Sequence, residues 1–123
     1  MDMPTRLEAH DCRGVSEILM RIGDKWTVLV VMMLREKPRR FNELKRHVGG
    51  ISQQMLTRTL KTLERDGLVD RSVRETTPPQ VEYALTPLGH SLSAPVMHLG
   101  DWAIANLGEI HLNRHRYDAA THG

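Results

Sequence analysis

The apolar positions between Val15 and Ile22 follow the i, i+3, i+4, i+7 pattern, which predicts an amphipathic helix over these residues. Asp24 is a suitable N-cap for a second helix over about residues 25–35. The apolar run 28–31 alone could form a strand. The length of the segment and the cap before it favour a helix that is apolar all round and central to the core.

Two more helices follow, separated by a short break. Pro38 ends the second helix, and a short amphipathic segment begins at Phe41. The glycine pair at 49–50 is a tight break, and Ser52 is a suitable N-cap for a long helix that reaches about residue 66. The apolar stripe of this long helix consists of Leu56, Leu60 and Leu63.

Two strands and a last helix complete the pattern. The strands cover about residues 68–74 and 81–85, and the connection between them is short, polar and stiffened by two prolines. Thr86-Pro87 suits the start of a helix whose apolar residues recur at steps of four and three. Pro95 must kink or break that helix, and we expect a loose tail after residue 113.

This order of elements predicts a winged helix-turn-helix, and the fold class is mainly α with a small β-hairpin, that is, α+β. With 123 residues the chain has the size of one domain. We expect a core over about residues 12–107 and flexible tails over residues 1–11 and 114–123. The single cysteine, the lack of a signal-peptide pattern and the short apolar runs indicate a soluble, cytoplasmic protein.

Charge is distributed unevenly along the chain. Residues 35–74 carry eleven Lys and Arg against five Asp and Glu, a net charge of +6, whereas residues 1–34 carry −1 and residues 75–123 carry −3. A basic segment of this kind suits a polyanion. The same charges could form a solvated face that keeps the protein soluble, and charge alone does not separate the two interpretations.

The long helix after the break has a polar face opposite its leucine stripe. This face consists of Gln, Thr, Arg and Lys side chains. Such residue types suit base edges, because Gln can pair with adenine, Arg can bind guanine and the Thr methyl can contact thymine. The N-terminus of the helix, at Ser52, offers free N–H groups to a phosphate. A solvated helix face would look similar, but the order of elements and the basic segment favour DNA. The predicted DNA-reading residues are Gln53, Gln54, Thr57, Arg58 and Lys61.

Four arginines outside this helix are predicted to contact phosphates. Arg71 and Arg74 belong to the wing, and Arg39 and Arg40 precede the first helix of the motif. Arginines at such positions position a protein on DNA without reading its sequence. Arg71 could instead pair with a nearby carboxylate.

Seven stretches of the chain resemble those of the HxlR-type regulators, which are bacterial winged-helix transcription factors related to the MarR group. The resemblance runs from about residue 12 to residue 102, in order and with compatible spacing. It departs at Lys37, where many members have glycine, and this affects only the local turn. The stretches are 22–27 (IGDKWT), 40–44 (RFNEL), 50–52 (GIS), 56–57 (LT), 60–64 (LKTLE), 66–69 (DGLV) and 81–89 (VEYALTPLG).

The resemblance implies a cytoplasmic homodimer that binds near-palindromic operators, with the N-terminal and C-terminal helices forming the dimer; we expect a repressor. The apolar series from Leu88 to Leu107, with Ile104 and Ile110, favours a dimer independently, because it exceeds what a small core absorbs from one terminal helix. The alternative is a helix packed wholly on its own domain.

Some members of the resembled family carry a cysteine at the position of Cys12, where it senses electrophiles or oxidants. Arg13 and the N-terminus of the helix that follows would favour the reactive thiolate, and Asp11 would oppose it. The alternative is a small buried hydrophobe. Because the chain has one cysteine, a disulfide would join two Cys12 residues across a dimer, or Cys12 and a small thiol.

Two other functions are less consistent with the sequence. The alternative to a DNA-binding regulator is a winged-helix adaptor that binds proteins, but it would expose apolar anchors on the long helix, where none is present. No phosphate loop, nucleophile elbow or paired-carboxylate motif points to an enzyme, and no cofactor is predicted. His111 and His115 could share a metal with His98 or Asp118, but we favour a solvated tail and predict no metal site.

Overall fold

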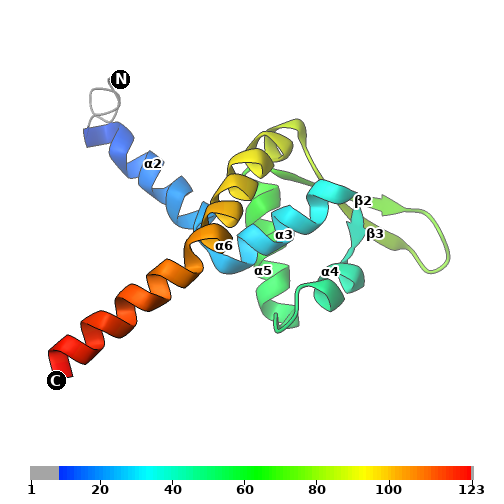
Figure 1. Ribbon diagram of the computed structural model, residues 1–123. Helices are drawn as coiled ribbons and strands as arrows, with labels where there is room; N and C mark the ends of the chain where they lie inside the picture. The colour runs from blue at the N-terminus through cyan, green and yellow to red at the C-terminus, as the bar shows by residue number, and fades with distance from the viewer. Residues whose placement is uncertain (1–8, 123) are drawn as a thin grey trace.

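The computed structural model describes residues 9–122, and the side chains of residues 12–121 within them. Within these residues, five helices lie beside a small sheet whose hairpin projects from one side of the body, and parts of the first and last helices extend away on the other side (Figure 1). Residues 1–8 and 123 of the predicted tails lie outside the described residues. The elements are α2 (Ala9–Ile22), α3 (Lys25–Glu36), β1 (Arg39–Arg40), α4 (Phe41–His47), α5 (Gln53–Arg65), β2 (Val69–Arg74), β3 (Gln80–Leu85) and α6 (Pro87–His122).

Three of the helices begin at the caps that the sequence predicts. The Asp24 carboxylate accepts hydrogen bonds from the N–H and the hydroxyl of Thr27, at 3.1 and 3.2 Å. The Ser52 hydroxyl accepts from the Met55 N–H at 3.1 Å, and the Thr86 hydroxyl accepts from the Gly89 N–H at 3.0 Å. In each of the three caps, the backbone N–H that donates has no acceptor within its own helix.

The core lies between α3, α4, α5 and the sheet. The leucine stripe of α5 is fully buried, as predicted. α3 is central but is not buried all round, because Leu29 is 37% exposed. The other fully buried large side chains are Val30, Val31, Leu34, Leu44 and Val69.

The sheet has three antiparallel strands in the order β1-β3-β2, one more than the predicted hairpin. β2 and β3 pair from Val69 opposite Leu85 to Arg74 opposite Gln80. The additional strand, β1, places Arg39 opposite Tyr83. A strand of two residues has no periodicity to detect, and its partner lies more than forty residues away along the chain. β1 joins α4 to the wing through backbone hydrogen bonds.

The two predicted tails are helical in the parts that the structure describes. α2 begins at Ala9, so residues 9–11 are helical, and α6 is one helix of 36 residues that passes through Pro95 and continues to His122. Pro95 is exposed and removes a single backbone bond. Residues 114–122 continue a helix that is already anchored, so they incur no cost of nucleation. Within the described residues, no helix combines the length and hydropathy needed to cross a membrane.

Candidate nucleic-acid interface

The predicted reading residues lie together on the outer face of α5. Gln53, Gln54, Arg58 and Lys61 are exposed and Thr57 is half-buried. With Thr62, these side chains line a surface groove of about 610 Å³. The opposite face of the helix carries the buried leucines, so packing fixes which side α5 presents to solvent.

The loop before α5 and its cap fix the start of the helix. Gly50 has a φ of +86°, a conformation that a residue with a Cβ adopts only with strain. Ser52 uses its hydroxyl to cap the helix, so any contribution of this residue to phosphate binding comes from the helix terminus that it organises.

α4 carries a second basic surface next to this terminus. Arg40, Lys45 and Arg46 are all exposed. The Arg40 N–H donates to the Glu43 carboxylate at 3.1 Å, and this hydrogen bond, reinforced by nearby cations, lowers the pKa of Glu43 below its ordinary value. The start of α4 is therefore held by its own first turn, and its basic side chains remain in solvent.

Arg39, which was predicted to contact phosphate, is instead a buried structural residue. Its side chain is 7% exposed, its Nε donates to the Met33 carbonyl oxygen at 3.0 Å, and its Nη2 lies 3.5 Å from the Glu36 carboxylate. The guanidinium thus binds the last turns of α3. The prediction is wrong because neighbouring arginines on a strand point to opposite sides, and here one side is the core.

The two wing arginines are exposed but project from opposite faces of the hairpin, since they are three positions apart on β2. Arg71 lies opposite Tyr83. The carboxylate that the sequence allows as a partner for Arg71 is bound instead by Arg74, whose Nη2 lies 3.8 Å from the Glu82 carboxylate. With 63% of its side chain exposed, Arg74 can exchange this partner for a phosphate.

The remaining candidates lie on the two helices that extend from the body. Cys12 is exposed and belongs to the first turn of α2, rather than preceding the helix as predicted. His111 and His115 are one turn apart on α6, whereas His98 lies about 20 Å away along the same helix. Among the described residues no three His, Cys, Asp or Glu side chains are placed to hold a metal ion.

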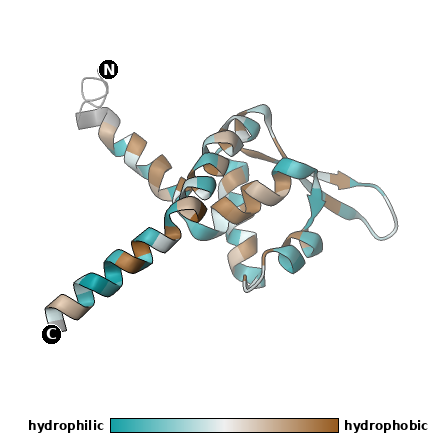
Figure 2. Cartoon of the chain, viewed as in Figure 1, coloured by the Kyte–Doolittle hydropathy of each residue, from teal (hydrophilic) through white to brown (hydrophobic). Residues whose placement is uncertain are grey.

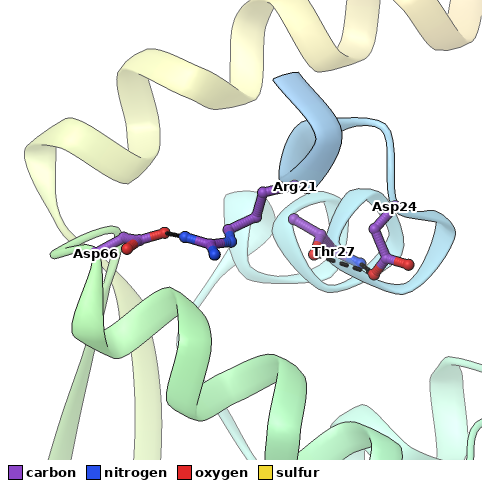
Figure 3. A network of polar contacts seen from close by, with 4 residues as sticks. All are labelled: Arg21, Asp24, Thr27 and Asp66. Atoms are coloured by element: carbon purple, nitrogen blue, oxygen red, sulfur yellow. Dashed lines mark hydrogen bonds and ion pairs between the residues drawn. The ribbon is translucent and has the colours of Figure 1, made fainter. Parts of the chain in front are cut away.

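One contact near α5 was not foreseen. The Arg21 guanidinium, in the last turn of α2, forms an ion pair with the carboxylate of Asp66, the C-cap of α5 (Figure 3). The two residues are 45 positions apart, and neither belongs to a motif that would relate them. Only the fold brings them together.

Comparison with known proteins agrees with this geometry. The model of the family described as HxlR-like helix-turn-helix matches residues 21–111. The uncharacterized HTH-type transcriptional regulator YtfH of Escherichia coli (strain K12) is 44% identical over 104 residues, which cover 85% of this chain and 82% of that protein.

Two solved structures are also similar. One is described as the transcriptional regulator ytfH of Salmonella typhimurium, with 40% identity, a TM-score of 0.76 and coverage of 82% of this chain and 90% of that one. The other is the redox regulator HypR in its oxidized form, with 39% identity, a TM-score of 0.71 and coverage of 76% and 96%.

Proposed function

Because the chain belongs to the HxlR-like helix-turn-helix family, it is a DNA-binding transcriptional regulator rather than an enzyme, and we propose that it represses transcription by binding a near-palindromic operator as a homodimer. The observation that carries this proposal is the outer face of α5, which is polar and exposed while the opposite face is locked into the core. A protein of this class works where the chromosome lies, so we also propose a cytoplasmic location.

In this proposal α5 enters the major groove and reads bases. Gln54, Thr57, Arg58 and Lys61 face base edges, with Gln53 beside them at the N-terminal end of the helix. Phosphates are contacted by the N-terminus of α5 at Ser52 and by exposed arginines outside the helix. These arginines are Arg40, Arg71 and Arg74.

The homodimer is supported by where the exposed apolar side chains lie. Among the residues whose side chains are described, all but two of the large exposed hydrophobic residues belong to α2 or α6. Brown, hydrophobic segments recur along both helices where they extend from the body in Figure 2. Ile104 is 78% exposed, Trp102 60% and Ile18 59%. A monomer would leave this surface in water, whereas a two-fold pairing of these helices buries it. Residues 12–107 then form the core of a single DNA-binding domain.

The test compares two single substitutions on operator and scrambled duplexes at several salt concentrations. Arg58→Ala should cost about 1–3 kcal/mol on the operator and relax the preference at one base pair per half-site, because the guanidinium can hold two acceptors of one guanine. Arg74→Ala should weaken binding to both duplexes alike and reduce the salt slope by roughly one unit per lost contact. If Arg58→Ala lowers both affinities equally and leaves the base preference intact, α5 does not read bases with this face.

We also propose that oxidation of Cys12 regulates DNA binding, supported by the likeness to HypR, a redox regulator, and by the exposure of the thiol. Two Cys12 thiols of a dimer would form one disulfide while an oxidant such as diamide takes up the two hydrogen atoms. Diamide should change operator affinity and produce a dimer that dithiothreitol separates on a denaturing gel. Equal sensitivity of the wild type and Cys12→Ser would refute this role.

A further inference from the structure

The turn that follows the recognition helix α5 is held by both of the helices that extend from the body. From the N-cap of α6, the Thr86 hydroxyl donates to the Gly67 carbonyl oxygen at 2.6 Å, and the Thr86 N–H donates to the Leu68 carbonyl oxygen at 3.1 Å. From α2, Arg21 pairs with Asp66. We call residues 66–68 the α5 turn.

The two attachments differ in kind. Thr86 donates two hydrogen bonds to the turn, and Gly89, three residues later, is buried against the Leu68 backbone. The attachment of α2 is a single ion pair whose side chains are 35% and 30% exposed. The attachment from α6 is therefore rigid, and the attachment from α2 can open without unfolding the domain.

The space around the ion pair is hollow. Arg21 and Asp66 border a cavity of about 650 Å³ that lies between α2, the α5 turn and the first turns of α6. The other lining side chains include Ile18, which is 59% exposed, and Leu88, which is 57% exposed, so apolar packing does not close the gap within one chain. The ion pair between Arg21 and Asp66, drawn in Figure 3, joins α2 to the α5 turn at the border of this cavity.

We infer that the Arg21–Asp66 ion pair is a positioning contact that couples the dimer helix α2 to the recognition helix and so sets the separation of the two α5 helices. This inference rests on the proposed dimer. In a two-fold dimer the recognition helices must match two half-sites at a fixed spacing. The orientation of α5 relative to α2 determines that spacing. Arg21, in the last turn of α2, contacts Asp66 at the C-terminal end of α5 and so links the two helices.

The experiment uses the full-length protein and an operator selected by the wild type from random duplexes. Arg21→Met removes the pair, and Arg13→Met is the matched control, since Arg13 is an exposed arginine on the same helix, about 12 Å earlier. Affinity is measured on the operator, on the operator with one base pair inserted between the half-sites, and on a scrambled duplex. Melting temperature is measured in parallel.

The wild type and Arg13→Met should bind the operator about tenfold more tightly than the version with the insertion, because each half-site contact depends on spacing. Arg21→Met should reduce this ratio to roughly threefold or less while its affinity for scrambled DNA stays within about twofold, since phosphate contacts do not require a fixed spacing. Its melting temperature should stay within about 3 °C of the wild type, as expected for an exposed pair. The double variant Arg21→Asp/Asp66→Arg should restore the spacing preference.

An unchanged spacing ratio in Arg21→Met, or the same loss in Arg13→Met, would overturn the inference. If Arg21→Met does not fold, Asp66→Asn makes the same test, because it removes the charge and keeps the size of the side chain. A wild type that is monomeric or selects no operator would overturn the proposed function itself. A wild-type dimer that selects an operator, but whose spacing preference does not depend on Arg21, would overturn only this inference.

Discussion

Replacing Gly89 with alanine adds a methyl group at the point where α6 contacts the α5 turn. A Cβ at this position would fall far inside the contact distance of the Leu68 carbonyl oxygen and 3.0 Å from Cδ2 of Leu85. The first neighbour is backbone, so no rotation of a side chain relieves the overlap. Either α6 moves away from the turn or the turn moves away from α6.

The cost follows from these contacts. Overpacking a tight site costs about 1–3 kcal/mol. The Leu68 carbonyl oxygen accepts the Thr86 N–H at 3.1 Å, so displacing it weakens a hydrogen bond of about 1 kcal/mol. Alanine in a helix recovers roughly 0.5–1 kcal/mol relative to glycine. We therefore expect a net loss of about 2 kcal/mol, which lowers the melting temperature of a chain of this size by roughly 5–10 °C.

Gly108→Ala is the matched control, because it is the same substitution in the same helix and a Cβ there meets nothing within 4 Å. Denaturation in urea at one fixed protein concentration should show Gly89→Ala with a lower midpoint and Gly108→Ala with a midpoint at or above that of the wild type. If Gly89→Ala were as stable as Gly108→Ala, the conclusion that α6 contacts the α5 turn too closely at Gly89 to admit a methyl group would be refuted.

Three further outcomes are expected. Arg39→Ala should destabilise the protein by about 2 kcal/mol in urea denaturation, because it leaves the Met33 carbonyl oxygen without its donor, whereas Arg40→Ala should leave the midpoint unchanged and weaken DNA binding. Asp24→Ala should cost about 1 kcal/mol in the same assay through loss of the α3 cap. Because the pKa of Glu43 is lowered in the folded state, its stabilising effect is present above the ordinary glutamate pKa and is lost as pH falls through the lowered value. Glu43→Gln should therefore flatten the dependence of the urea midpoint on pH between about 3 and 6.

The features that the sequence predicts correctly depend on residues close together in the chain. Asp24, Ser52 and Thr86 each accept an amide three residues later, so the cap and its helix can be identified from one short window. The outer face of α5 is predictable for the same reason, because helical periodicity assigns the polar residues to the side opposite the leucines.

The features that the sequence does not predict depend on distant pairs. Burial of Arg39 follows from β1 pairing with β3, and the Arg21–Asp66 contact follows from the packing of α2 near the end of α5. No local pattern distinguishes Arg39 from Arg40, although one binds α3 and the other faces solvent. A pair of neighbouring basic residues therefore cannot be assigned to DNA until the fold shows which of them points outward.

α6 shows how one apolar pattern can serve two kinds of packing. Before this helix leaves the body, Leu92 packs against the core and Val96 is 3% exposed, although Leu88 in the first turn is 57% exposed. Beyond Val96, Leu99 and Leu107 continue the same steps of three and four, yet at least half of each side chain is exposed. The apolar residues recur with the same spacing on both sides of Val96, because both parts belong to one continuous helix. The difference is that the domain covers Leu92 and Val96 in the first part and leaves the second part exposed. The exposed continuation identifies which part of α6 requires a second subunit, and the contacts of Thr86 and Gly89 join that same helix to the end of the recognition helix.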